Sequence, residues 1–199
     1  MDGLKLYLQQ ACHAEIQERY YNGWTHDHYV SGVFCFCPDG TIPIAFYNVP
    51  GAVHDSQIAE MGNIYEKLEK MWNLYGGKCT VDSAFGRVNR EFIIKLSQDD
   101  LFLNADNFED QVEEIQIARQ ATSMRQAAEW GMRALQSSFP RMKDRFVYEE
   151  RGERRITLKL FVLLFNMRAR MVGINQIKNV YMANLNRDAE EILGNETDF

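Results

Sequence analysis

A short run of β-branched and apolar residues ends at a single carboxylate in residues 78–86, which read Lys-Cys-Thr-Val-Asp-Ser-Ala-Phe-Gly. This pattern predicts a central strand of an α/β sheet that delivers Asp82 to the carboxyl edge of the sheet. Ligands bind at that edge in such folds. Asp82 is therefore a candidate functional residue, although an acid at the end of a strand is as often a turn former or a helix cap.

Two further acids could join Asp82 in a site. Asp2 stands at the start of the chain, and Glu129 lies in a helical stretch between Arg125 and Arg133, each four residues away. The same spacing fits an exposed ladder of ion pairs, each worth roughly 0.2–0.5 kcal/mol. Spacing alone favours the ladder, so a catalytic role for Glu129 needs other support.

The first half of the chain has a clear order of elements. Residues 29–49 contain two β-prone runs separated by Pro38-Asp39-Gly40, which predicts a β-hairpin that ends at Pro50-Gly51. Asp55 or Ser56 then caps one helix that continues to Tyr75 and ends at Gly76-Gly77. A helix in this position crosses over the sheet, so the Asp82 strand should run parallel to an earlier strand. If that earlier strand carries Asp2, the two carboxylates emerge side by side.

The second half is predicted to be mainly helical. Residues 87–96 form a helix or helical turn, and residues 104–114 form a loop or the start of a solvated helix. Thr122 or Ser123 caps the helix that carries Glu129, and residues 149–155 form a charged turn. Residues 156–171 form a helix so apolar that protein should cover most of its circumference, with Asn166 as a buried, hydrogen-bonded amide.

Length and cysteine usage restrict the class of protein. The 199 residues suit one domain, with a core over residues 1–150, a closing helical segment over 151–182 and a polar tail over 183–199. No apolar run is long enough to span a bilayer, and no signal peptide is visible. The four cysteines form no Cys-x-x-Cys pair, which indicates reduced thiols in an intracellular protein.

The net charge of −6 argues against nucleic acid as a ligand, but the charge is unevenly distributed. Residues 119–170 contain 12 Lys and Arg against 5 Asp and Glu. A basic face on an acidic domain is expected where only that face meets phosphates. Charge alone favours a salt-bridged helical surface instead.

The segment 20–28 carries aromatic and histidine side chains. His26 and His28 lack further ligands at zinc-site spacing, so hydrogen bonding is the favoured role for both. Tyr20, Tyr21 and Trp24 could stack on nucleic-acid bases, although core packing is favoured for at least one of them. The chain has no Gly-x-Ser-x-Gly, phosphate loop or dinucleotide fingerprint, which disfavours hydrolases of the serine type and nucleotide-binding enzymes.

Taken in order, the motifs resemble one family over nearly the whole chain. The matching pieces are Asp2-Gly3, the segment 50–56 (Pro-Gly-Ala-Val-His-Asp-Ser), Val81 to Phe85, the segment 125–131 (Arg-Gln-Ala-Ala-Glu-Trp-Gly), Arg141-Met142-Lys143 and Leu164-Phe165-Asn166. In this order they resemble the DDE-superfamily endonucleases of Harbinger-type DNA transposons, a branch of the ribonuclease H-like fold. The resemblance implies an α/β fold with a mixed sheet, in which a β-hairpin and parallel strands are flanked by helices.

The resemblance also implies a site and a chemistry. Asp2, Asp82 and Glu129 would be the catalytic triad and would bind two Mg²⁺ or Mn²⁺ ions, since hard oxygen ligands favour these cations. Two ions about 3.5–4 Å apart can activate a water or a 3′-hydroxyl for phosphodiester cleavage or strand transfer. Asp55 and His54 would support the site from behind, although capping a helix is the favoured role for Asp55. The residues expected to contact DNA phosphates are Arg125, Arg133, Arg141 and Lys143.

The start of the chain departs from the family pattern. Only Met1 precedes Asp2, so we expect a truncated first strand with weakened pairing around Asp2, and no upstream DNA-binding domain. The expected partners are DNA at transposon ends, in the nucleus, and a separate DNA-binding protein or further copies of the chain. The alternative is a catalytically decayed or domesticated copy that acts as a protein-interaction module.

Overall fold

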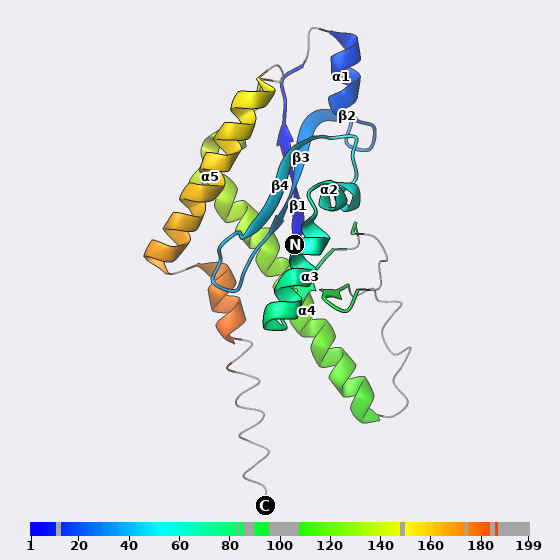
Figure 1. Ribbon diagram of the computed structural model, residues 1–199, viewed down its shortest axis with the longest axis vertical. Helices are drawn as coiled ribbons and strands as arrows, with labels where there is room; N and C mark the ends of the chain where they lie inside the picture. Colours follow the sequence, from blue (N-terminus) through cyan, green and yellow to red (C-terminus); the bar gives the residue numbers. More distant parts are fainter. Residues whose placement is uncertain are drawn as a thin grey trace, which may run out of the picture.

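The computed structural model describes residues 1–10, 13–82, 84–85, 90–95, 108–147, 150–173, 175–183 and 186, without the side chains of residues 108–114. Helices cover both faces of a small sheet, as Figure 1 shows. The α/β class predicted from the sequence is confirmed. The more specific assignment to a ribonuclease H-like fold stays a prediction.

The main sheet is built around strand β3 (Asp27–Cys35). Strand β1 (Asp2–Tyr7) pairs with it antiparallel along its whole length, from Asp2 opposite Phe34 to Tyr7 opposite Tyr29. Strand β4 (Ile44–Pro50) pairs with the other side of β3, and β2 (Tyr21–Asn22) pairs with its first residues. Asp2 is thus fully paired with β3, and the expected weakening is not seen on this side of β1.

The predicted hairpin is confirmed as β3 and β4. Its connection turns at Gly40, whose φ of +83° lies in the left-handed region that glycine adopts most easily. The Gly40 nitrogen donates to the Cys37 carbonyl, and the Cys37 nitrogen donates to the Thr41 carbonyl. Strand β4 ends at Pro50, as predicted.

The segment that leads to Asp82 forms a second, two-stranded sheet. Strand β5 (Cys79–Thr80) pairs in parallel with β6 (Ile93–Ile94), which comes later in the chain. The prediction of a helix over residues 87–96 is therefore wrong at β6, while residues 87–89 and 96 lie outside the described residues. The predicted pairing with an earlier strand is reduced to one bond, in which the Met1 nitrogen donates to the Thr80 carbonyl at 2.8 Å.

The single helix predicted between Asp55 and Tyr75 is two helices. Helix α2 (Asp55–Met61) and helix α3 (Ile64–Tyr75) are separated by Gly62 and by Asn63, whose φ is +49°. Apolar residues continue at helical spacing from α2 into α3, so the spacing alone could not reveal the break. The N-cap of α2 is His54, without a side-chain capping bond, so the prediction that Asp55 or Ser56 caps this helix is wrong. Helix α3 ends at Gly76, as predicted.

Helix α4 (Phe108–Ser138) runs without interruption through the position where a new helix was predicted to begin. Thr122 and Ser123 do not cap it, because the Thr122 hydroxyl donates to the Ala118 carbonyl one turn earlier. A short 3₁₀ turn, η2 (Pro140–Met142), follows. Helix α5 (Arg151–Val172) begins inside the segment that was predicted to be a charged turn.

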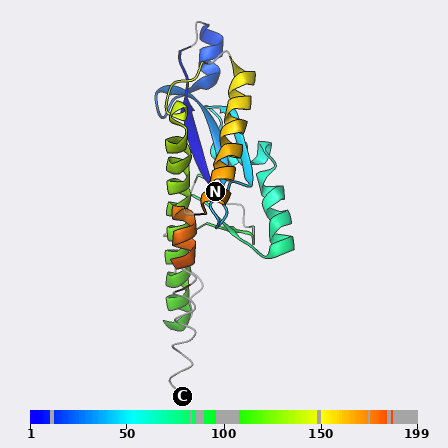
Figure 2. The ribbon, with the colours of Figure 1, turned by 90° about the vertical axis from the view of Figure 1, so that its left-hand side faces the viewer.

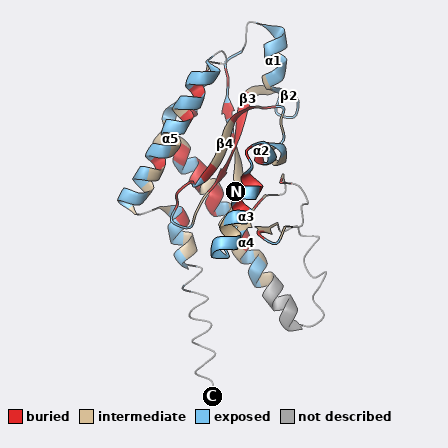
Figure 3. Cartoon of the chain, in the orientation of Figure 1, coloured by how far each residue is buried: buried red, intermediate tan, exposed pale blue. Residues whose placement is uncertain are grey.

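Two hydrophobic clusters lie on opposite faces of the main sheet. Val33 of β3 packs in one cluster with α2 and α3, while Phe34 packs in the other with Leu135 of α4 and Leu158 of α5. This alternation follows from the two-residue period of a strand. Figure 2 shows α4 on one side of the strands and α2 with α3 on the other, and Figure 3 shows buried residues along the strands.

Helix α5 differs from its prediction in one respect and agrees in another. Asn166 is hydrogen-bonded as predicted, because its side chain bonds both the nitrogen of Ile42, at 2.7 Å, and the carbonyl of Ile42, at 2.9 Å, but it is half-buried rather than buried. The expected cover around most of the helix is absent among the described residues, since Ile156 is 69% exposed and Met171 is 81% exposed. Among the helices that the structure describes, none is both long and apolar enough for a membrane span.

Candidate active site

Asp2 and Asp82 are brought together where β1 begins and β5 ends. The bond from the Met1 nitrogen to the Thr80 carbonyl joins the two strands at this point, directly beside both acids. One Asp2 oxygen, Oδ1, accepts from the backbone nitrogen of Gly3 at 2.7 Å. Asp2 as a whole is half-buried.

Asp82 occupies a tight turn after β5. Its Oδ1 accepts from the backbone nitrogen of Ala84 at 2.8 Å, and its carbonyl accepts from the nitrogen of Phe85 at 3.2 Å. Val81 and Phe85 on either side are buried and anchor the turn in the core. Asp82 is therefore a turn former, as one reading of the sequence held, and it follows a strand of the two-stranded sheet rather than the predicted central strand of the main sheet.

Glu129 reaches the same edge from α4, which packs against both β1 and β5. Ala127 and Ala128 are buried against the sheet, and these small side chains permit a close approach of the helix. The Glu129 carboxylate is 41% exposed and bonds Arg125 Nη1 at 3.2 Å. The i, i+4 ion pair predicted from spacing thus exists, and it occurs beside the other two acids.

The three carboxylates influence one another electrostatically. Burial raises the pKa of Asp2 above its ordinary value, the Gly3 hydrogen bond and the positive charge of the Met1 amino group lower it, and the negative charges of Asp82 and Glu129 add smaller raising effects. Asp82 and Glu129 therefore lie close enough to Asp2 for their charges to act on its carboxylate. A cation at the cluster would remove the repulsion.

A fourth carboxylate, that of Asp55, lies over Gly3. A Cβ atom on Gly3 would stand 2.3 Å from Asp55 Oδ2, so only glycine leaves room for this carboxylate. Burial raises the pKa of Asp55, and the charge of Asp82 adds to the effect while Lys5 and His54 oppose it. The sequence showed Gly3 only as part of a motif, and its steric role becomes visible only when α2 is placed against β1.

The four predicted phosphate contacts are not gathered in one place. Arg125 lies at the acids, and Arg133 is exposed two turns further along α4. Arg141 and Lys143 follow α4, near Phe146, which bridges to Leu8 at the far end of β1. Leu8 lies roughly 20 Å along the strand from Asp2, at about 3.3 Å per residue. The structure therefore places Arg141 and Lys143 away from the acidic cluster.

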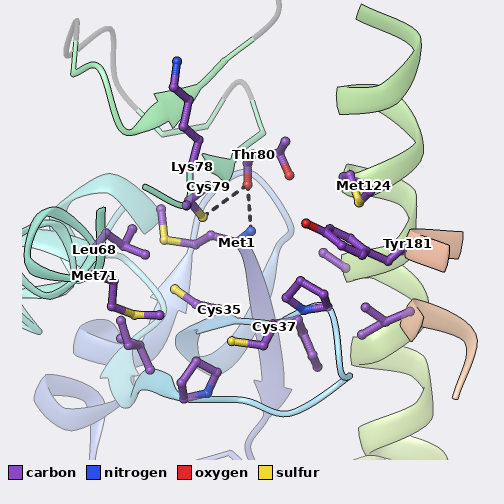
Figure 4. Close-up of a pocket in the computed structure, with 18 of the residues that line it drawn as sticks. Met1, Cys35, Cys37, Leu68, Met71, Lys78, Cys79, Thr80, Met124 and Tyr181 are labelled. Atoms are coloured by element: carbon purple, nitrogen blue, oxygen red, sulfur yellow. Dashed lines mark hydrogen bonds between the residues drawn. The ribbon is translucent and has the colours of Figure 1, made fainter. Parts of the chain in front are cut away.

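An apolar cavity of about 250 Å³ adjoins the cluster, and the sequence did not predict it. Met1, Cys79 and Thr80 line it from the strands, and Met124 lines it from α4 (Figure 4). A hydrogen bond with Cys35 lowers the pKa of Cys79, while the same bond raises the pKa of Cys35.

The donor set suits a hard divalent cation, but the side chains are not arranged around one. No group of three or more His, Cys, Asp and Glu side chains within the described ranges is placed to hold a metal ion. Each of the three carboxylates, those of Asp2, Asp82 and Glu129, has one oxygen engaged by another group of the chain.

The histidines and aromatic residues of the segment 20–28 have separate roles. The Tyr21 hydroxyl hydrogen-bonds His26 Nδ1 at 3.2 Å, which agrees with the favoured hydrogen-bonding role of His26. Tyr20 packs against the core cluster beneath α4 and α5, so core packing is confirmed for one of the three aromatic residues. Trp24 is 93% exposed and keeps its face available to a planar ligand.

Comparison with known proteins gives one match. Searches of curated proteins and of solved structures found no similar protein. The model of one protein family, described as DDE superfamily endonuclease, matches residues 1–166. The matched range includes Asp2 on β1, Asp82 in the turn after β5 and Glu129 on α4. The chain therefore belongs to the DDE superfamily endonucleases.

Proposed function

We propose that this chain is the nuclease domain of a transposase, that it cleaves DNA phosphodiester bonds with Mg²⁺ or Mn²⁺, and that Asp2, Asp82 and Glu129 are its metal ligands. The observation that carries the proposal is the packing of the three elements that bring the acids together: the Met1 nitrogen bonds the Thr80 carbonyl of β5, and α4 packs against both β1 and β5. Membership of an endonuclease family gives this cluster its chemical meaning. Within the family we propose the Harbinger type, acting in the nucleus at transposon ends.

Each residue has a defined task under this proposal. Asp2, Asp82 and Glu129 supply hard oxygen ligands, and bound divalent cations would activate the attacking oxygen and stabilise the leaving one. The Asp55 carboxylate lies against Gly3, where it would help to orient the site, and His54 is the N-cap residue of the helix that begins at Asp55. Arg125, released from Glu129, is placed to meet a phosphate, whereas Arg133, Arg141 and Lys143 would contact DNA further from the scissile bond.

The proposal is tested by incubating supercoiled plasmid with the purified chain and Mn²⁺ or Mg²⁺. We expect nicking or strand transfer that falls at least ~100-fold in Asp82→Asn, since this change removes a ligand charge while keeping the shape of the side chain. Asp144→Asn is the matched control, because Asp144 is an exposed acid near the opposite end of β1. Cleavage that survives Asp82→Asn would rule out this site.

A second candidate function is a protein-interaction module that has lost catalysis. This function is favoured because no three His, Cys, Asp or Glu side chains among the described residues are placed to hold a metal ion. Calorimetric titration with Mn²⁺ separates the two functions. Binding that Asp2→Asn and Asp82→Asn each abolish supports the nuclease, while a folded chain that binds no Mn²⁺ supports the module.

A further inference from the structure

Helix α5 has two apolar sides, and only one of them meets the rest of the described chain. Leu158 and Phe165 on the inner side are 1% and 7% exposed and pack in the cluster beneath the sheet. The outer side, here called the α5 stripe, consists of six large apolar residues that are 41–81% exposed: Ile156, Leu160, Leu163, Leu164, Met167 and Met171.

The α5 stripe is continuous. Its residues recur at intervals of three and four, which places them on one face of the helix over several turns. Figure 1 shows α5 at the margin of the molecule, and Figure 3 shows exposed residues along its outer surface. Contiguous apolar surface rimmed by polar groups marks an interaction site in many proteins.

One flank of the α5 stripe is strongly basic. Arg151, Arg155 and Lys159 follow one another at intervals of four residues, and all three are exposed. Together with residues 45–50 of β4 and Met61 they line a cavity of about 560 Å³ that contains no acidic side chain. Among the described strands, β4 pairs only with β3, so this cavity follows the open edge of the sheet.

We propose that the α5 stripe and its basic flank bind an acidic amphipathic helix of a partner protein. The apolar side chains of the partner would cover the stripe, and its carboxylates would face Arg151, Arg155 and Lys159. Helix-in-groove recognition of this kind uses apolar anchors at intervals of three and four residues. The charges on the partner would fix its register and orientation.

The charge of α5 argues against other occupants. Helix α5 carries six basic residues and only one acid, Glu153, so a second copy of α5 would bring like charges together. The phosphates of a nucleic acid would pair with the basic side chains of the flank. The polar phosphate–sugar backbone would not cover the apolar side chains of the α5 stripe. An acidic amphipathic helix satisfies both parts of the surface.

The test uses two synthetic helical peptides as long as α5, labelled for fluorescence anisotropy. One has Leu along one face and Glu elsewhere, and the other has Lys in place of every Glu. We expect the Glu peptide to bind the full chain and the Lys peptide to bind at least roughly tenfold more weakly. Equal affinities would overturn the proposal.

Paired variants test the two parts of the surface. Leu160→Gln with Met167→Gln removes apolar contact, and Arg155→Glu with Lys159→Glu reverses the flank; each pair should weaken the Glu peptide by about tenfold or more. Leu74→Gln, at a position 73% exposed, and Lys70→Glu are the controls on α3 and should leave binding unchanged. Unfolding curves check that every variant is folded.

Three other results would overturn the proposal. The first is that either α5 variant pair binds the Glu peptide as tightly as the native chain does. The second is a dimer in sedimentation experiments that Leu160→Gln with Met167→Gln dissociates, because a second copy would then occupy the stripe. The third is displacement of the Glu peptide by duplex DNA, which would assign the flank to nucleic acid.

Discussion

Charged side chains usually face water and large apolar side chains are usually buried. The acidic edge of the sheet departs from the first rule, and the outer face of α5 departs from the second. At the edge, Asp2 and Asp55 are half-buried beside like charges, and their pKa values are raised. On α5, large apolar side chains such as Leu160 and Met167 remain in water. Each arrangement costs free energy in the isolated chain. The comparison teaches that the edge would gain from a cation and the α5 face from an apolar partner surface.

The two regions are also separated within the sheet. Strand β3 lies between β1, which begins at the acidic edge, and β4, which packs against α5. Substitutions in one region should therefore have effects that are nearly independent of substitutions in the other. The following predictions can break or sharpen the comparison.

The largest expected effect separates the two sides of α5. Leu158→Ala should lower the free energy of unfolding by about 2–5 kcal/mol, because it leaves a cavity in the core. Leu160→Ala, two residues later and 50% exposed, should change it by less than about 0.5 kcal/mol. Urea denaturation of both variants measures the difference. Similar losses would show that the outer face is packed in solution.

An intermediate effect is expected at the acidic edge. Gly3→Ala places a Cβ atom 2.3 Å from Asp55 Oδ2, so the Asp55 carboxylate must leave its position over Gly3. The free energy of unfolding should fall by about 1 kcal/mol. The raised pKa of Asp55, measured by NMR titration, should move down toward its ordinary value as the carboxylate gains solvent.

Gly77→Ala provides the matched control for this substitution, since among the described residues, chain neighbours aside, no atom lies within 4 Å of a Cβ placed there. An unchanged Asp55 pKa in Gly3→Ala would contradict the close approach of the two residues.

The smallest effect concerns the pH dependence of stability. The pKa of Asp2 is raised in the folded chain, so its ionisation opposes folding increasingly as pH rises from the ordinary value of 3.8 through the raised value. Asp2→Asn should therefore raise the free energy of unfolding at pH 7, by less than about 1 kcal/mol because the group is only partly buried. The gain should vanish below both pKa values, in urea titrations carried out across the pH range.

Asp27→Asn should behave in the opposite way. The bond from Arg145 lowers the pKa of Asp27, so this acid stabilises the fold above its ordinary pKa and loses the effect as pH falls.

Adding Mn²⁺ should stabilise the native chain but not Asp2→Asn. If Asp2→Asn instead lowers the free energy of unfolding at pH 7, the ionised Asp2 carboxylate does not destabilise the folded chain.

Local patterns predicted the elements whose stability is local. The hairpin followed from two β-prone runs around Pro38-Asp39-Gly40, and the end of α3 followed from Gly76, because turn chemistry is set by a few neighbouring residues. The i, i+4 pair of Arg125 and Glu129 was also visible from spacing. The candidate acids came from the order of motifs, and the family match agrees with that source.

Contacts between distant residues explain the failures. The break at Asn63 and the continuous path of α4 through Thr122 do not follow from propensity, because the surrounding packing can override a weak local preference. The pairing of β5 with β6 depends on which strand lies within reach after folding. Large apolar residues occur on both the exposed and the buried side of α5, so the sequence could not distinguish the two sides.

The sequence by itself determined the α/β class, the hairpin and the identity of the three candidate acids, since these depend on neighbouring residues and on the order of motifs. Only the tertiary structure decided that Asp82 and Glu129 both act on Asp2, that Asp55 lies over Gly3, and which side of α5 faces water. The physical reason is that charge coupling and burial depend on distances in space, which residues far apart in the chain acquire only when the strands and helices pack together.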